Sequence, residues 1–186
     1  MFLVDGSGSV EAYGRGNFKR CLNFVKQVAS SFTISKADGH VSVTVFSSRA
    51  QVIFDLNRYT NINQIFQAVD GIKYPRRGTR TGLGLKTVFA RVLSGARKGT
   101  PRVLIVMTDG RTRDKISMIS RKFHKAGVAV YAIGVGRKYR EKELRIMASS
   151  PKPKHVLKIE FSLLTNLISK LQADVCKGNV RCYFVF

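Results

Sequence analysis

The sequence predicts an α/β fold: a Rossmann-like, doubly wound, mainly parallel six-stranded sheet with one antiparallel edge strand and helices on both faces. Two observations lead to this prediction. Segments typical of strands alternate along the chain with segments of helical spacing, which is the order of a parallel sheet flanked by helices. Residues 103–107 and 128–135 are almost wholly apolar, which indicates strands buried on both faces.

The predicted strands are segments in which apolar residues alternate or run together. They are residues 1–5, 40–47, 51–56, 103–107, 128–135 and 155–159. The second and third strands alternate and are separated by Ser48, Arg49 and Ala50 alone, so they form a hairpin. This hairpin supplies the antiparallel strand at the edge of the sheet.

The predicted helices are segments in which apolar residues recur every three or four positions. They are residues 11–32, 61–69, 83–93, 114–126, 141–148 and 161–175. Residues 71–78 contain Pro75 and two arginines, and are predicted to form a loop.

The length of 186 residues suits one domain with a sizeable core. The chain has no internal repeat or linker, and no apolar run reaches the roughly 20 residues of a membrane span. No signal peptide is visible, so we expect a natural N-terminus that has been trimmed. Residues 177–186 follow the last predicted helix, and we interpret them as a C-terminal tail or the end of an expressed fragment.

The charge of the chain is strongly positive, with 33 Lys and Arg against 11 Asp and Glu and a net charge of +22. Such a field attracts polyanions, which include nucleic acid, sulfated glycans, anionic membranes and acidic proteins. The charge alone does not choose among them.

The three cysteines fit neither a disulfide scaffold nor a zinc site. Cys21 falls on the apolar face of the first predicted helix and is expected to be a buried free thiol. Cys176 and Cys182 leave two pairings open, with each other or with a missing upstream cysteine.

Oxygen-bearing side chains follow the predicted strands at their carboxyl ends. Asp5, Ser7 and Ser9 follow the first strand, Asp109 follows the strand at 103–107, and Thr79 lies at the start of a helix. Ligand sites of doubly wound sheets form at this edge. Oxygen ligands without histidine or thiol suit Mg²⁺, Mn²⁺ or Ca²⁺. The pattern therefore predicts a site for a hard divalent cation.

Three other kinds of site match the sequence less well. The dinucleotide-binding fingerprint fails because Gly6 and Gly8 are followed by Glu11 where a glycine is required, and no phosphate-binding P-loop motif is present. The serines lie in no nucleophile elbow. The three histidines, His40, His124 and His155, are expected to be structural or exposed rather than catalytic bases.

The segments "DGSGS", "GTRTG" and "MTDG", in this order and on these elements, resemble the von Willebrand factor type A domain. The resemblance covers roughly residues 1–176. It implies a metal-ion-dependent adhesion site (MIDAS) formed by Asp5, Ser7, Ser9, Thr79 and Asp109. In that family the hydroxyls contact the ion directly and the aspartates act partly through water. An acidic residue of the partner completes the coordination.

Arginines surround the predicted metal ligands and form a basic rim: Arg76, Arg77, Arg80, Arg111 and Arg113. A positive collar would attract and orient an approaching carboxylate. The segment "LRIMASSPKPKHVLKI" resembles A domains of extracellular matrix proteins such as collagens and matrilins. This resemblance implies a secreted, non-enzymatic adhesion module that binds collagen-like or acidic matrix proteins. The charge adds sulfated glycans and calcium carbonate mineral as candidate partners.

The alternative is an intracellular, nucleic-acid-binding A domain. Proteins that bind single strands place stacking aromatics among their basic residues. Here only Tyr74 and Tyr139 lie among arginines and lysines, which disfavours nucleic acid. An enzyme is disfavoured because the motifs contain no pair of nucleophile and base.

Overall fold

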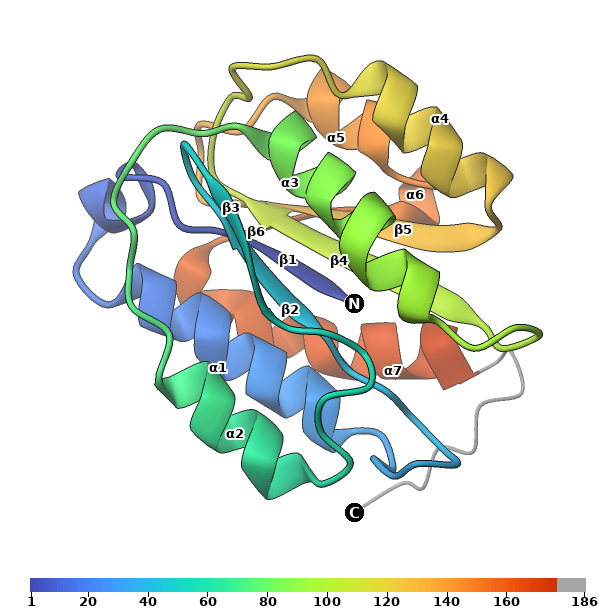
Figure 1. Ribbon diagram of the computed structural model, residues 1–186. Coiled ribbons are helices and arrows are strands. Elements are labelled where there is room, and N and C mark those ends of the chain that lie inside the picture. The colour runs from blue at the N-terminus through green and yellow to red at the C-terminus, as the bar shows by residue number, and fades with distance from the viewer. Residues whose placement is uncertain (177–186) are drawn as a thin grey trace.

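The six strands form one sheet in the order β3-β2-β1-β4-β5-β6 in the computed structural model, which describes residues 1–176 (Figure 1). The strands are β1 (Phe2–Asp5), β2 (Val43–Phe46), β3 (Ala50–Phe54), β4 (Arg102–Thr108), β5 (Val128–Val135) and β6 (Val156–Ile159). Neighbouring strands are parallel except for the antiparallel pair β2–β3. The predicted mainly parallel sheet with an antiparallel edge strand is confirmed.

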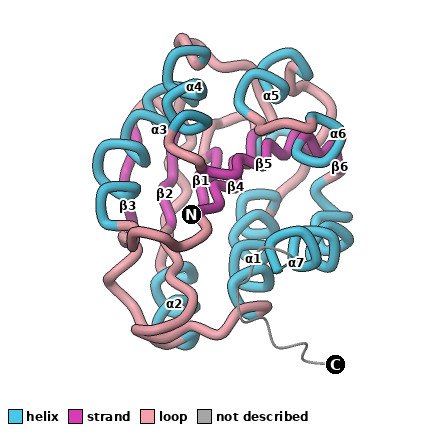
Figure 2. The backbone as a smooth tube through the Cα atoms, turned by 90° about the vertical axis from the view of Figure 1, so that its right-hand side faces the viewer, coloured by secondary structure: helices cyan, strands magenta, loops and turns pink. Residues whose placement is uncertain are grey.

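Helices cover both faces of the sheet, as Figure 2 shows from the side. Their bounds are α1 (Asn17–Ser30), α2 (Ile62–Asp70), α3 (Thr81–Thr87), α4 (Ser117–Lys125), α5 (Glu141–Met147), α6 (Lys152–His155) and α7 (Ile168–Cys176). Helices α1, α2 and α7 lie on one face, and α3, α4 and α5 lie on the other. Among the described residues, no helix is long and apolar enough to cross a membrane.

The first predicted helix differs from the observed one at its start. Helix α1 begins at Asn17 rather than at residue 11, and Val10–Tyr13 forms a separate 3₁₀ turn. Gly14 and Gly16 have φ values of 146° and 84°, a backbone conformation that ends regular helix and favours glycine. The Glu11 carboxylate then accepts hydrogen bonds from the N–H groups of Gly16 and Phe18 at the new helix start.

Residues 161–176 also differ from the single predicted helix over 161–175. Phe161–Leu167 is a 3₁₀ helix, and α7 follows it. The short helix α6 was not predicted, and His155 ends it instead of beginning a strand. The imidazole rings of His40, His124 and His155 each hydrogen-bond a backbone carbonyl, which agrees with structural roles.

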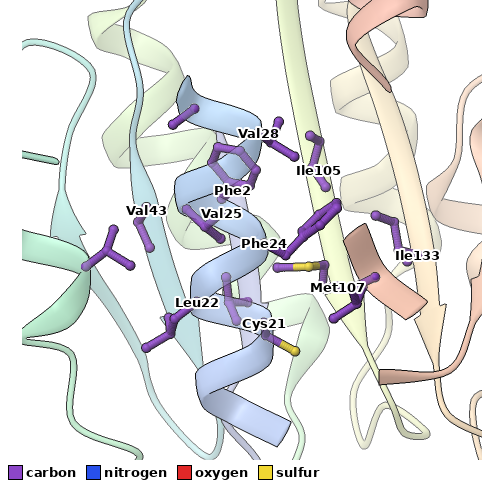
Figure 3. Packing of buried hydrophobic residues seen from close by; sticks show 14 of the residues in the cluster. Phe2, Cys21, Leu22, Phe24, Val25, Val28, Val43, Ile105, Met107 and Ile133 are labelled. Carbon is purple, nitrogen blue, oxygen red and sulfur yellow. The ribbon is translucent and has the colours of Figure 1, made fainter. Parts of the chain in front are cut away.

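The core on the α1 face joins one helix to the middle of the sheet. Figure 3 shows Phe24, Val25 and Val28 of α1 facing Ile105 and Met107 of β4. Burial of these apolar groups fixes the helix against the strands whose ends carry the predicted ligands.

The cysteine predictions have different outcomes. Cys21 is a buried free thiol, as expected, and burial raises the pKa of that thiol. The predicted pairings of Cys176 and Cys182 fall outside what the structure describes.

The strand order changes direction between β1 and β4, which run side by side with Val4 opposite Met107. Asp5 and Thr108, one residue further along, therefore lie at the same level. The loops that follow these two strands meet at the carboxyl edge of the sheet, where doubly wound folds form their ligand sites.

Candidate metal centre

Three loops are fastened together at the carboxyl edge of the sheet. The loop after β1 exchanges backbone hydrogen bonds with the loop before α3: the N–H of Arg76 donates to Gly6 O (3.0 Å), and that of Gly8 to Arg77 O (2.8 Å). On its other side, the loop before α3 is held by the loop after β4, because the N–H of Arg113 donates to Thr79 O (2.9 Å). These bonds hold the three loops that carry the predicted ligands against one another.

Two glycines of the motifs are required by close contacts between these loops. A methyl group at Gly6 would lie 2.7 Å from Cδ of Pro75, and one at Gly82 would lie 2.5 Å from the carbonyl oxygen of Lys115. Neither position accepts a side chain without movement of its neighbours. The glycines of "DGSGS" and "GTRTG" therefore allow the loops to approach each other.

The hydroxyl groups of the motifs converge on Asp109. Ser9 Oγ donates to Asp109 Oδ1 (3.0 Å), Ser7 Oγ lies 3.0 Å from Ser9 Oγ, and Ser7 Oγ is 3.5 Å from the same carboxylate oxygen. A methyl group added at Gly110 would lie 3.6 Å from Ser9 Oγ and 3.8 Å from Thr79 Oγ1. The structure therefore brings Ser7, Ser9, Thr79 and Asp109 together.

Asp5 lies beneath this group and is 2% exposed. Its Oδ2 accepts a hydrogen bond from Thr108 Oγ1 (2.7 Å), and its Oδ1 accepts one from the N–H of Ser7 (2.8 Å). Both oxygens of Asp5 are thus bonded within the protein. Asp5 anchors the loop that carries the serines.

Two positioning residues were missed by the sequence analysis. Thr108 orients Asp5, and its position within "MTDG" was a signal that could have found it. The hydroxyl of Tyr74 donates to Ser7 O (2.5 Å) and accepts from the N–H of Glu11 (3.3 Å), while its ring stacks on Phe18. Tyr74 lies in a segment predicted only as a loop, so no periodic pattern pointed to it.

The two carboxyl groups of the site have unusual electrostatics. Burial, and then the nearby charge of Asp109, raise the pKa of Asp5 to about 7 against the opposing effect of its hydrogen bonds. Burial also raises the pKa of Asp109, while hydrogen bonds from Ser9 and Ser7 and the charge of Lys138 act in the opposite direction. Two buried carboxylates without a cation are therefore an unfavourable arrangement.

One oxygen of this site has no partner within the described residues: Asp109 Oδ2 is buried and accepts no hydrogen bond. An unpartnered buried carboxylate oxygen is costly. A bound cation would remove that cost and the repulsion between the two aspartates. Two carboxylates and three hydroxyls form an oxygen-only donor set that fits Mg²⁺, Ca²⁺ or Mn²⁺. Across residues 1–176, no three His, Cys, Asp or Glu side chains lie close enough together to hold a metal ion. A cation at this site would therefore need the hydroxyl groups as ligands.

The basic rim lies on the same loops as the candidate ligands. Its five side chains are exposed: Arg76, Arg77, Arg80, Arg111 and Arg113. The guanidinium of Arg76 lies over the Tyr74 ring, 5.4 Å from its centroid. Arg80 is 3.9 Å from the carboxylate of Asp114, which caps the first N–H groups of α3. Lys138, whose charge reaches Asp109, adds to this rim from the loop after β5.

Every acidic side chain of the protein is engaged by another group of the chain. The eleven accept a hydrogen bond or form an ion pair: Asp5, Glu11, Asp38, Asp55, Asp70, Asp109, Asp114, Glu141, Glu143, Glu160 and Asp174. Several of these acids are already engaged by neighbouring groups, and the 22 cations in excess of the acids leave the surface strongly positive.

A family model for the von Willebrand factor type A domain matches residues 1–171. Among curated proteins, matrilin-4 of Mus musculus is 38% identical over 95% of this chain and 29% of its own length. Matrilin-1 of Gallus gallus is 35% identical over 98% of this chain and 37% of its own length. The collagen alpha-1(XII) chain of Notophthalmus viridescens is 32% identical over 96% of this chain and 19% of its own length. The chain thus spans less than two fifths of the length of these relatives.

Solved structures of one matrix protein have the same fold. Proximal thread matrix protein 1 from the mussel byssus matches with a TM-score of 0.87 and 28% identity over 94% of this chain and 46% of that chain. A further structure of that protein has a zinc-occupied MIDAS motif and matches with a TM-score of 0.86 and 29% identity over 94% of this chain and 44% of that one.

These comparisons confirm the resemblance that the motifs predict. The relatives are matrilins, a collagen chain and a thread matrix protein, so the predicted extracellular-matrix location is confirmed at the level of these relatives. The chain belongs to the von Willebrand factor type A domain family.

Proposed function

We propose that this domain is a non-enzymatic adhesion module that binds acidic groups of extracellular matrix partners with the help of a divalent cation. Its ligands would be Asp5, Ser7, Ser9, Thr79 and Asp109. Mg²⁺ is the first candidate, with Ca²⁺ or Mn²⁺ as alternatives. The observation that carries the proposal is the buried Asp109 Oδ2, which has no partner among the described residues although hydroxyls surround its carboxylate. We further propose that the domain comprises residues 1–176, with 177–186 as a tail.

The residues of the site have distinct tasks in this proposal. Ser7, Ser9 and Thr79 present hydroxyl oxygens from two loops, while Asp109 supplies a charged oxygen from a third. Asp5 holds the serine loop through the N–H of Ser7 and through Thr108. A cation held by these residues would supply a positive charge that a carboxylate of the partner could bind.

The exposed arginines of the rim favour acidic partners. They lie on the same loops as the candidate ligands, and only Arg80 of the five has a carboxylate of a described residue within 4 Å. A positive collar increases the association rate of an acidic ligand and orients its approach. Collagen-like or acidic matrix proteins are therefore the proposed partners. The charge also supports sulfated glycans, and it is the only support for calcium carbonate mineral.

Nucleic acid is a weaker candidate because both aromatic rings near the basic loops already pack against other residues of the protein. The Tyr74 ring stacks on Phe18, with centroids 4.8 Å apart. The Tyr139 ring lies so close to Gly134 that a methyl group there would be 2.6 Å from Cγ of Tyr139. Each ring therefore offers less surface for stacking on a base than an unpacked aromatic would.

The test measures cation binding and partner binding in parallel. Isothermal titration with Mg²⁺ and Mn²⁺ compares the unchanged protein with Asp109→Ala, and Asp70→Ala serves as the control that removes an exposed carboxylate paired with Lys26. Binding to collagen and to poly-aspartate is then measured with Mg²⁺ and with EDTA.

We expect Asp109→Ala and EDTA to abolish both kinds of binding, and Asp70→Ala to leave them unchanged. Partner binding that persists in EDTA and in Asp109→Ala would overturn metal-dependent capture and move partner recognition to the basic surface.

A further inference from the structure

A cleft of about 490 Å³ opens beside the candidate metal centre, between the loop that follows β4 and helix α5. Its walls begin at Thr112, three residues after Asp109. Four basic residues line it: Arg113 and Lys115 from the loop, and Arg140 and Lys142 from the start of α5. The cleft is thus a concentrated patch of positive charge adjoining the predicted ligands.

The two acidic residues in the walls of the cleft are occupied by groups of the protein. Asp114 accepts hydrogen bonds from the N–H groups of Gly82 and Leu83, both at 2.8 Å, and from the hydroxyl of Thr112. Glu143 accepts from the N–H of Thr112 (2.9 Å) and lies 3.6 Å from Arg140. Asp114 thus joins the loop after β4 to the start of α3, and Glu143 joins the same loop to α5.

Three of the four cations have no such partner. The side chains of Arg113, Lys115 and Lys142 are exposed and form no ion pair with any described residue. Like charges crowded around one cleft repel each other, and a bound anion would relieve this repulsion.

Arg113 connects the cleft to the candidate metal centre. Its N–H donates to Thr79 O (2.9 Å), and Nη1 of its guanidinium would lie 3.7 Å from a methyl group placed at Gly78. The residue next to Gly78 is the predicted ligand Thr79. A ligand that spans the two places would therefore pass along Arg113.

We propose that this cleft is a second anion subsite, which binds a sulfate ester of a sulfated glycan whose neighbouring uronate carboxylate is bound at the metal centre. The carboxylate half of this proposal rests on the proposed function, whereas the sulfate half rests on the cleft alone. The guanidinium of Arg113 and the ammonium groups of Lys115 and Lys142 can donate charge-assisted hydrogen bonds to the several oxygens of a sulfate ester.

The surroundings of the cleft favour a glycan over a peptide. Peptides without an acidic or phosphorylated motif bind through apolar anchors or by pairing with a strand, and a phosphorylated peptide is therefore the competing ligand to test. Among the described residues the large apolar side chains with high exposure are Met118 and Leu163, and neither lines the cleft. The cleft also lies beyond the carboxyl ends of the strands rather than along a sheet edge. Recognition there depends on charge, which suits a linear polyanion.

The experiment compares two double variants that remove the same charge. Lys115→Ala/Lys142→Ala empties the cleft of two cations, whereas Lys86→Ala/Lys98→Ala removes two exposed lysines outside it. The probe is a chondroitin sulfate hexasaccharide, measured by isothermal titration at fixed ionic strength with Mg²⁺ and with EDTA. A chemically desulfated hexasaccharide, which keeps its uronates, and a phosphoserine peptide are the comparison ligands.

We expect the cleft variant to bind the sulfated hexasaccharide at least about tenfold more weakly than the control variant, which corresponds to about 1.4 kcal/mol. Its affinity for the desulfated hexasaccharide should equal that of the control. Equal losses in the two variants, or tighter binding of the phosphoserine peptide than of the glycan, would overturn the proposal. If the cleft variant loses affinity but EDTA has no effect, the sulfate subsite stands and the metal-dependent function fails.

Discussion

The two ends of the sheet are built from opposite kinds of residue. At the carboxyl ends of the strands, buried polar groups surround two aspartates, and one carboxylate oxygen has no partner among residues 1–176. At the amino ends, a cavity of about 500 Å³ is lined largely by apolar side chains such as Phe2, Val28 and Phe32. Arg97 closes that end by donating to the carbonyl groups of Lys36 and Ala37.

The amino end of the sheet therefore contributes to stability, whereas the carboxyl end carries the candidate site. Apolar burial at the amino end and in the core lowers the free energy of the folded state. At the carboxyl end, two like charges and an unsatisfied oxygen lie close together. They raise the free energy of the folded state unless a cation is bound. Four predictions test this difference between the two ends of the sheet.

Phe2→Ala tests the apolar end. Phe2 is 4% exposed and lines the cavity, so we expect a loss of about 3–5 kcal/mol in the free energy of unfolding, measured with urea. The cation affinity of the folded protein should not change. Leu163→Ala, at an exposed position, is the control and should cost less than about 0.5 kcal/mol. A fall in cation affinity with Phe2→Ala would mean that the two ends are coupled.

Asp109→Asn tests the opposite end. The amide keeps an oxygen for the hydroxyl of Ser9 but removes the charge that opposes Asp5. We expect the metal-free protein to gain about 1 kcal/mol in stability and to lose the rise in melting temperature that Mg²⁺ produces in the unchanged protein. Asp70→Asn should alter neither quantity. A variant that is less stable without metal would contradict the stability cost assigned to the carboxyl end.

The pH dependence of stability sharpens the same point. The pKa of Asp5 is about 7 in the folded protein, above its ordinary value of 3.8, so the folded state keeps a proton that the unfolded chain loses. Without metal, the free energy of unfolding should therefore fall as the pH rises from about 4 to about 7, by up to about 1.4 kcal/mol per pH unit.

Urea unfolding in EDTA at several pH values measures this fall. Asp5→Asn should reduce it, and an equal slope in that variant would assign the effect to another group.

Tyr74→Phe tests a positioning residue at the carboxyl end. The variant loses the hydrogen bond from the Tyr74 hydroxyl to Ser7 O but keeps the ring that stacks on Phe18. We expect cation affinity to fall about tenfold, as measured by titration with Mn²⁺. Tyr59→Phe is the matched control, because the ring of Tyr59 packs against Phe54. Equal cation affinities in the two variants would show that the Tyr74 hydroxyl does not position the site.

The strand segments and the three motifs could be found in the sequence because their signals are local. An unbroken apolar run specifies a strand with two covered faces, and the register of β1 on β4 then sets Asp5 beside Thr108. The helix starts were less accurate. Left-handed glycines at positions 14 and 16, together with the Glu11 cap, decide where α1 begins, and periodicity does not detect them.

By itself, the sequence determined the α/β class, the polar residues at the strand ends and the excess of positive charge, because each depends on residue type and spacing alone. Only the tertiary structure decided that one oxygen of Asp109 has no partner in the part of the chain that the structure describes, and that the Tyr74 hydroxyl bonds the backbone of Ser7. It also decided that Asp114 and Glu143, in the walls of the neighbouring cleft, accept hydrogen bonds from backbone N–H groups. These features depend on contacts between loops far apart in the chain, where burial and partner geometry set the energy of each polar group.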